Sequence, residues 1–431
     1  MNFDIKNGVL LRYYGNEKNI VLPDEAKIVD RRAFADKNIE SIDLNQAETI
    51  DEYAFSKCHN LKKINFGNVY NIEKHAFSFC DSLEEISIST KIVKSKAFYF
   101  CENLKRVYLC GDIKEIDSRA FMGCSSLEEI KPEGNSNYTV CDNVLYNKEM
   151  TELISYPANR KEIEWTVPDS VRKICASAFY LNQNLEKINL NNTEIIGLMS
   201  FSFCKKLSEV ICSNLKIIGE CGFRFCEKLN KINLPENAII EPWCFEGCRL
   251  LNVIPTPNIE NIAGNYSKCG IKEINLPKVK SIDFFAFMYN PLEKAILGEK
   301  IEKIGMFSFY NCKNLKEAII KGKLKSIGRN AFYYCEKLEK INLPEGLETI
   351  DFYAFKNCYS LKKIYLPETL LVIGENAFAN TGLEEIKIPK ACKTVSHSAF
   401  WGCENLKKIY IGKETKTEKY SFPENCEIIY Y

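Results

Sequence analysis

The chain of 431 residues lacks an excess of charge of either sign, because 58 lysines and arginines stand against 57 aspartates and glutamates, for a net charge of +1. A chain balanced in this way has no long-range field to attract nucleic acid or an anionic membrane, so neither is expected as a partner. No apolar run approaches the roughly 18 residues that a membrane-spanning helix needs. The first residues, 1–8, show neither the basic nor the apolar region of a secretory leader, and we therefore expect a cytoplasmic protein.

Residues that perform catalysis or bind metals are also scarce. The chain has only three histidines, His59, His75 and His397, and none lies in a recognisable nucleophile motif. Adjacent carboxylates such as Glu84 and Glu85 are consecutive on an expected strand, so they point to opposite faces or into solvent and make no glycosidase pair. No Cys-x-x-Cys knuckle occurs. The sequence predicts no enzyme, no metal site and no cofactor.

One residue type is present in abundance and at a fixed interval. A phenylalanine returns every 21 to 23 residues over most of the chain, and Tyr266 occupies the one vacancy between Phe245 and Phe287. The series comprises Phe34, Phe55, Phe77, Phe98, Phe121, Phe179, Phe201, Phe223, Phe245, Phe287, Phe309, Phe332, Phe355, Phe378, Phe400 and Phe422. A period of this size indicates a solenoid, in which one short unit is stacked many times and buries its apolar face against its neighbours.

The segment 347–367 contains one complete unit. Its second half, Leu361-x-x-Ile364-x-Leu366-Pro367, alternates apolar and polar residues and predicts a strand that the proline ends. The half from Ile350 to Leu361 spaces its apolar residues three and four apart, which predicts a helical turn or a short 3₁₀ segment. The fold class is therefore an α/β solenoid with one parallel sheet face.

These motifs resemble the BspA-like, or Treponema pallidum-type, leucine-rich repeat, whose pattern runs L-x-x-I-x-L-P, then L-x-x-I-x-x-x-A-F-x-x-C-x-x-L. The resemblance covers about seventeen units of 21–23 residues and implies a right-handed superhelix. Ala-Phe becomes Ser-Phe, Gly-Phe or Cys-Phe in a few units, and the segments 264–266 and 291–292 are irregular. Members of the family are often exported, so the resemblance keeps open a secreted or cell-surface protein whose leader has been trimmed.

Two segments interrupt the period, and both are expected to be hairpins. They are residues 5–23 and the gap between Phe121 and Phe179, which contains Val144-Leu145-Tyr146 and Trp165-Thr166-Val167-Pro168. The predicted organisation is an N-terminal hairpin cap (1–23), a first array with repeats 1–5 (24–132), a hairpin insertion (133–168), a second array with repeats 6–16 (169–413) and a C-terminal half-repeat cap (414–431).

Twelve of the twenty cysteines lie three residues after the repeated aromatic: Cys58, Cys80, Cys101, Cys124, Cys204, Cys226, Cys248, Cys269, Cys312, Cys335, Cys358 and Cys403. Adjacent units would bring these thiols within about 5 Å, so distance alone leaves a disulfide open. Their position in a buried turn favours small apolar side chains that donate weakly to loop carbonyls. Many free thiols also fit a reducing compartment.

On the exposed face of the strands, two columns of side chains flank the buried isoleucines. The leading column mostly alternates in charge from one unit to the next, as at Glu85 and Arg106, which predicts lateral ion pairs. The trailing column places apolar and aromatic residues on this otherwise polar face, a usual mark of an interaction site. The candidate partner-binding residues are Ile211, Val253, Pro255, Ile296, Ile319, Lys340, Lys363, Tyr365 and Tyr410. The alternative is that these side chains only fill strand positions in irregular units.

We therefore expect a non-enzymatic, monomeric scaffold that binds a protein, and the resemblance implies adhesion to a host or matrix protein. An intracellular adaptor is the alternative that the thiols and the missing leader favour. An enzyme on a solenoid frame would need an acid and a base that converge near 133–173 or 255–292, and no such pair is apparent.

Overall fold

The computed structural model describes residues 2–134, 137–255 and 259–431. The chain is a β-solenoid of parallel strands with about 19 turns, which confirms the predicted fold class and exceeds the predicted count of about seventeen repeats. It divides into two compact units, residues 1–227 and 228–431. The segment boundaries expected from the sequence are not tested by this division and stay a prediction.

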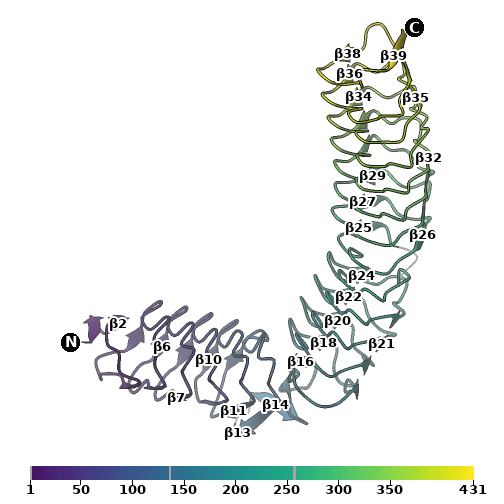
Figure 1. Ribbon diagram of the computed structural model, residues 1–431. Helices are drawn as coiled ribbons and strands as arrows, with labels where there is room; N and C mark the ends of the chain where they lie inside the picture. Colours follow the sequence, from purple (N-terminus) through teal and green to yellow (C-terminus); the bar gives the residue numbers. More distant parts are fainter. Residues whose placement is uncertain (1, 135–136, 256–258) are drawn as a thin grey trace. The chain divides into compact units, whose positions relative to one another are not determined.

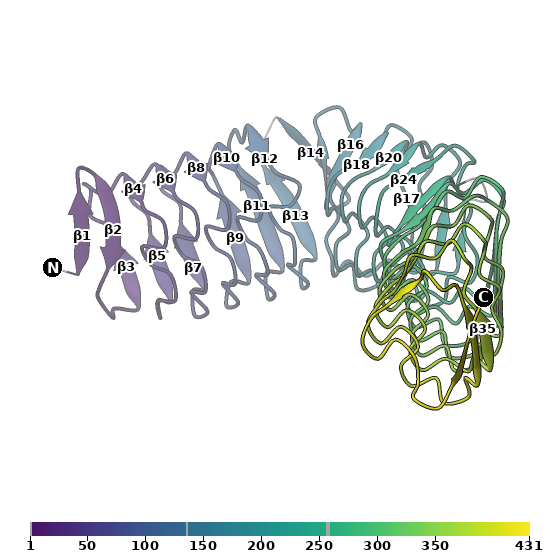
Figure 2. The same cartoon turned by 90° about the horizontal axis from the view of Figure 1, so that it is seen from above.

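Most turns carry two strands, which we call front and back. A back strand of two or three residues precedes the repeated phenylalanine, and a front strand of two to five residues follows the column cysteine. In the first unit the back strands begin with an antiparallel hairpin and then run parallel (Figures 1 and 2). Their order is β1 (Phe3–Lys6), β2 (Val9–Tyr13), β4 (Ile28–Val29), β6 (Thr49–Ile50), β8 (Asn71–Ile72), β10 (Ile92–Val93) and β12 (Glu115–Ile116).

The front strands of the same stretch form two separate sheets (Figure 2). One contains β3 (Asn19–Val21), β5 (Ser41–Asp43) and β7 (Lys63–Asn65), and the other contains β9 (Glu85–Ile88), β11 (Arg106–Cys110) and β13 (Glu129–Glu133). The back sheet is continuous behind this break, since β8 pairs with β10.

The rest of the first unit starts from a second antiparallel motif, in which β15 pairs with both β14 and β16. The back strands here are β14 (Tyr138–Cys141), β15 (Val144–Asn147), β16 (Glu152–Ser155), β18 (Lys173–Ile174), β20 (Ile195–Ile196) and β22 (Ile217–Ile218). The front strands are β17 (Glu164–Thr166), β19 (Lys187–Asn189) and β21 (Glu209–Ile211).

The second unit repeats the plan. It begins with β23 (Lys231–Ile232) and β24 (Ile239–Ile240). Its long back sheet contains β25 (Asn261–Ala263), β27 (Ser281–Asp283), β29 (Lys303–Ile304), β31 (Ser326–Ile327), β33 (Thr349–Ile350), β34 (Val372–Ile373), β36 (Thr394–Val395) and β38 (Lys416–Thr417). Its front strands form two sheets, β26 (Glu273–Leu276), β28 (Lys294–Leu297), β30 (Glu317–Ile320) and β32 (Lys340–Ile341), then β35 (Glu385–Lys387), β37 (Lys408–Ile411) and β39 (Glu427–Tyr430).

The segment between the back strand and the cysteine is not helical in any described repeat, so the predicted helical or 3₁₀ turn is wrong. In the repeat that contains Phe355, i to i−3 hydrogen bonds join Ala354 to Asp351 and Cys358 to Phe355, which accounts for the spacing of apolar residues. Tyr353 and Asn357 have φ values of 58° and 62° and interrupt any helix, because left-handed residues cannot continue it. The segment is instead a pair of tight turns whose amides bond to the next turn of the solenoid, as in Phe355 N–H to Ala377 O at 2.7 Å.

The repeated phenylalanines form stacked columns. Ring centroids lie 4.8 Å apart for Phe34 and Phe55 and 5.3 Å apart for Phe332 and Phe355, and these rings are fully buried. Tyr266 stacks between Phe245 and Phe287, as its place in the sequence predicts. The sequence did not reveal that Tyr13 and Tyr156 begin the stacks on Phe34 and Phe179.

The column cysteines bind the carbonyl of the preceding aromatic turn, which confirms the prediction of buried weak donors. The Sγ of Cys58 donates to Phe34 O at 3.1 Å, and that of Cys312 donates to Phe287 O at 3.1 Å. At one position where the column has no cysteine, an asparagine does the same: Asn290 Nδ2 donates to Tyr266 O at 2.6 Å. The position therefore requires a small donor for an otherwise unsatisfied buried carbonyl.

Phe332→Ala removes a fully buried ring from the middle of the stack in the second unit. We expect a loss of about 3 to 5 kcal/mol in the free energy of unfolding, felt mainly in the adjoining turns, because each turn contacts only its neighbours. Urea unfolding combined with limited proteolysis measures both effects, and Phe352→Ala, which truncates an exposed ring, is the control. Unfolding that is unchanged by Phe332→Ala would contradict the stacked core.

Burial raises the pKa of the Cys58 thiol to about 12 from its usual value of 9.0. The folded state therefore favours the neutral thiol, so this contribution to stability is complete below pH 9 and declines as the pH rises toward 12. At pH 8 we expect iodoacetamide to alkylate the exposed Cys141 in the native protein and to leave Cys58 unmodified until the chain unfolds. Peptide mass spectrometry reads out both sites, and rapid native labelling of Cys58 would be inconsistent with its burial.

Candidate partner-binding face

Five of the nine candidate residues lie together on the front face of the second unit. Two hollows follow one another there, with volumes of about 940 Å³ and 350 Å³. Ile319, Lys340, Lys363 and Tyr365 line the larger hollow, and Lys363, Tyr365 and Tyr410 line the smaller one. The sequence pattern thus predicts residues that come from four of five successive turns and lie on one face.

The other four candidates do not line these hollows. Ile296 pairs with Ile319 across β28 and β30 and is half-buried beside the larger hollow. Ile211 is exposed on β21 of the first unit, and Val253 is exposed in a segment without a strand. Pro255 is buried, so its prediction as part of an exposed face is wrong, because the residues around it do not keep the alternation of a strand.

The front sheet is interrupted at the turn that carries Tyr365. β32 ends at Ile341 and the next front strand to form is β35, so residues 361–367 are in no strand. Within residues 259–431, the amides of Lys362 to Leu366 donate no backbone hydrogen bond, whereas in the regular turns Lys316 N–H and Lys407 N–H bond to Glu293 O and Glu384 O, each at 2.9 Å. The back sheet continues behind the break through β33 and β34.

A side chain takes the place of the ladder next to this break. The Asn342 amide donates to Ile320 O at 2.6 Å and accepts from Ile320 N–H at 2.7 Å. The backbone groups of Ile320 are therefore satisfied by a side chain, and the strand after β30 stops after two residues.

Tyr365 is 86% exposed, the highest value among the large apolar side chains of the described chain. Its neighbour Ile364 is 7% exposed, so the alternation of inward and outward side chains persists although the strand has lost its ladder. An aromatic ring held in water over a partly apolar hollow is a typical anchor for a protein partner.

The charges on this face are arranged differently from those elsewhere. The predicted lateral ion pairs are present at Lys294 and Glu317 (2.7 Å) and, in the first unit, at Arg106 and Glu85 (3.0 Å). Lys294 is the main cause of the lowered pKa of Glu317. Lys340 and Lys363 are successive in the leading column, and neither has an ion-pair partner in the part of the chain that the structure describes.

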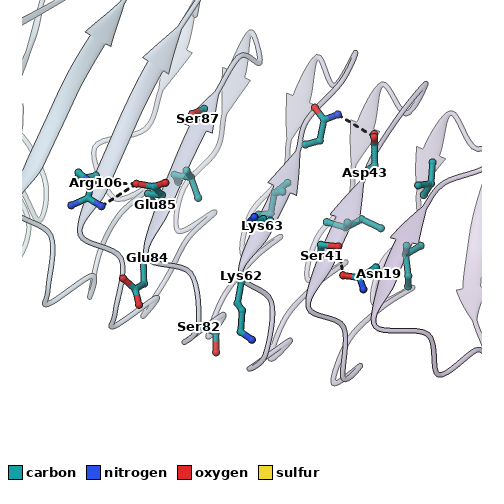
Figure 3. A pocket seen from close by; sticks show the side chains of 16 residues that line it. Asn19, Ser41, Asp43, Lys62, Lys63, Ser82, Glu84, Glu85, Ser87 and Arg106 are labelled. Atoms are coloured by element: carbon teal, nitrogen blue, oxygen red, sulfur yellow. Dashed lines mark hydrogen bonds and ion pairs between the residues drawn. The ribbon is translucent and has the colours of Figure 1, made fainter.

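The sequence did not reveal a third hollow, of about 750 Å³, in the first unit (Figure 3). It lies at another break in a front sheet, between β7 and β9, and is lined mainly by polar residues from five turns. Arg106 and Glu85 form an ion pair within the lining, and Asn65 donates to Asp43 at 3.1 Å. Lys62 and Glu84 instead pair with Glu40 and Lys105, which lie outside the lining. Its signal in the sequence is weak, because the strands on both sides of the break fit the repeat.

The described residues offer little for chemistry. His59 contacts Asp81 at 2.6 Å in an exposed pair, and His75 stacks on Tyr53 with its centroid at 4.8 Å. Within residues 2–134, 137–255 and 259–431, no three His, Cys, Asp or Glu side chains are grouped to hold a metal ion.

In the part of the chain that the structure describes, no helix is long and apolar enough to cross a bilayer.

Comparison with known proteins adds a family and several similar structures. The family described as "BspA type Leucine rich repeat region" matches residues 12–105, 48–166, 158–267, 239–350 and 325–431. A search of the curated proteins returns no match.

Three solved structures are similar to this chain. A leucine-rich repeat protein from Bacteroides ovatus is 22% identical, with a TM-score of 0.58 over 100% of this chain and 97% of that one. One from Eubacterium ventriosum is 21% identical, with a TM-score of 0.39 over 87% and 88% of the two chains. The pneumococcal vaccine antigen PcpA is 18% identical, with a TM-score of 0.40 over 98% and 91%. Only the first similarity is close enough to support the fold, and it supports the fold alone.

Proposed function

The chain belongs to the family of BspA-type leucine-rich repeat proteins, and from this premise we propose that it is a non-enzymatic scaffold that binds a protein partner around Tyr365. Solenoids of this kind generally act as scaffolds that bind proteins. The observation that carries the proposal is the exposed Tyr365 ring, which lines two adjacent hollows at the break in the front sheet.

Several features support a binding role for this face. The back sheet and the phenylalanine stack run unbroken behind Tyr365, so the ring is displayed on a supported frame. Ile319 is half-buried and adds apolar area beside it. A rigid aromatic anchor next to apolar surface and rimmed by charge has the composition of an interaction hot spot.

The biological role we propose is adhesion to a host or matrix protein, as the likeness to the BspA-type family suggests. An intracellular adaptor is the second candidate, and one observation favours it: no disulfide joins any of the cysteines that the structure describes, which fits a reducing compartment. Fractionation of the native cells with an antibody against this protein decides between the two, because an adhesin is found at the cell surface and an adaptor in the cytosol.

Tyr365→Ala should weaken binding of the partner at least tenfold and leave thermal unfolding unchanged, because the ring is exposed in the free protein and anchors of this kind contribute about 2 kcal/mol or more. Quantitative pull-downs from host extracellular and bacterial cytosolic extracts, run in parallel, identify the partner, and interferometry then gives the affinities.

Tyr70→Ala is the matched control, since Tyr70 is an exposed tyrosine of the first unit that lines neither hollow. Ile296→Ala and Ile319→Ala extend the test to the neighbouring strands. If the captured partner binds all three front-face variants as tightly as it binds the native protein, this face is not the binding site.

A further inference from the structure

The leading column of the front face changes its charge pattern at one place. It runs Lys294, Glu317, Lys340, Lys363, Glu385, Lys408 through the second unit. Lys340 and Lys363 are the only neighbours in this column, over both arrays, that carry the same sign. Like charges on adjacent turns repel each other, so this pair does not stabilise the free protein.

Neither lysine forms an ion pair within residues 259–431. Glu317, the neighbour on one side, is engaged by Lys294 at 2.7 Å, although Lys340 also contributes to its lowered pKa. Glu385, the neighbour on the other side, lines the smaller hollow together with Lys363. Glu339 and Glu384 also line the larger hollow, but they belong to a second column in which they alternate with Lys362, so that column is balanced by itself. Lys340 and Lys363 therefore place two like charges side by side without an ion-pair partner.

The same two lysines adjoin the apolar part of the face. Lys340 lines the larger hollow together with Ile319, Ile341 and Tyr365, and Lys363 lines both hollows together with Tyr365. A carboxylate placed between the two ammonium groups would accept charge-assisted hydrogen bonds from both. A small inorganic anion would leave the aromatic ring and the isoleucines uncovered, so the combination favours a ligand with an acidic and an apolar side chain close together.

The hollows also indicate the length of the ligand. They extend from the turn of Glu317 to the turn of Tyr410, which is four intervals between strands and roughly 19 Å along the stack. An extended chain of about six residues spans this distance. We propose that the face binds an extended acidic segment of a partner protein, in which an aspartate or glutamate lies between Lys340 and Lys363 and an adjacent apolar side chain packs on Tyr365.

This inference rests on the proposed function, and the test separates the two. The probe is a displayed library of random heptapeptides, selected in parallel on the native chain, on the double variant Lys340→Gln/Lys363→Gln, on Tyr365→Ala and on the control Lys321→Gln/Lys323→Gln. The control removes the same charge from two exposed lysines of the same unit that line neither hollow. Thermal unfolding establishes that all the variants are folded.

On the native chain and the control we expect the selected peptides to be at least twofold enriched in aspartate and glutamate, with an apolar residue within two positions. A fluorescent copy of the leading peptide should lose at least tenfold in affinity on the double variant and on Tyr365→Ala, and 0.5 M salt should weaken its binding to the native chain.

Selected peptides without acidic residues, acidic peptides that bind the double variant undiminished, or no enrichment over a blank surface would each overturn the inference. If binding requires Tyr365 and not the lysines, the inference fails and the proposed binding face stands. If binding requires neither, both fail.

Discussion

The stack of phenylalanine rings is the interaction on which the rest of the molecule depends. Within a stack, an interior ring such as Phe355 is covered by the rings above and below it, and a column thiol such as that of Cys358 donates to the backbone carbonyl of the preceding aromatic. The two contacts fix the distance between successive turns at a point away from the front strands. The turns are therefore held together mainly by the stack and the back sheet. A turn can lack the hydrogen bonds of its front strand while the stack and the back sheet stay intact.

Because the stack and the back sheet hold the turns together, the candidate site can lie where the front sheet is interrupted. In a complete parallel sheet the backbone groups are bonded to each other and only the side-chain tips meet a partner. At the turn of Tyr365 the ladder is absent, two hollows form, and an aromatic side chain is 86% exposed over half-buried isoleucines. The break between β7 and β9 in the first unit also coincides with a hollow, whose lining is mainly polar and includes the ion pair of Arg106 and Glu85. The two breaks thus present different chemistry on the same kind of frame.

Much of the fold could be predicted from the sequence, because the phenylalanine and cysteine positions recur with one period and Tyr266 fills a vacancy in it. The places of Tyr13 and Tyr156 in the stacks are not predicted, because both residues lie in hairpins that lack the Ala-Phe pair. The sequence predicts helical segments where the structure has turns, because the i to i−3 hydrogen bonds of these turns space the apolar residues as a helix does. The left-handed residues that interrupt the turns include aromatics such as Phe79, and an aromatic residue does not indicate a left-handed backbone. The side-chain columns placed Tyr365 and Lys363 correctly on one face. The break beside them lies next to the bonds between Asn342 and Ile320, a contact between turns that no local pattern records.

A continuous stack and back sheet support a locally broken front sheet at the candidate site. Hydrogen–deuterium exchange of the native chain, read at single-residue resolution, measures this difference between the sheets. The account predicts that the amides of Lys363, Ile364 and Tyr365 exchange rapidly, while those of Ile319 in β30, Ile373 in β34 and Ile409 in β37 are protected. Protection of the Tyr365 segment equal to that of its neighbours would show a complete ladder and contradict the account.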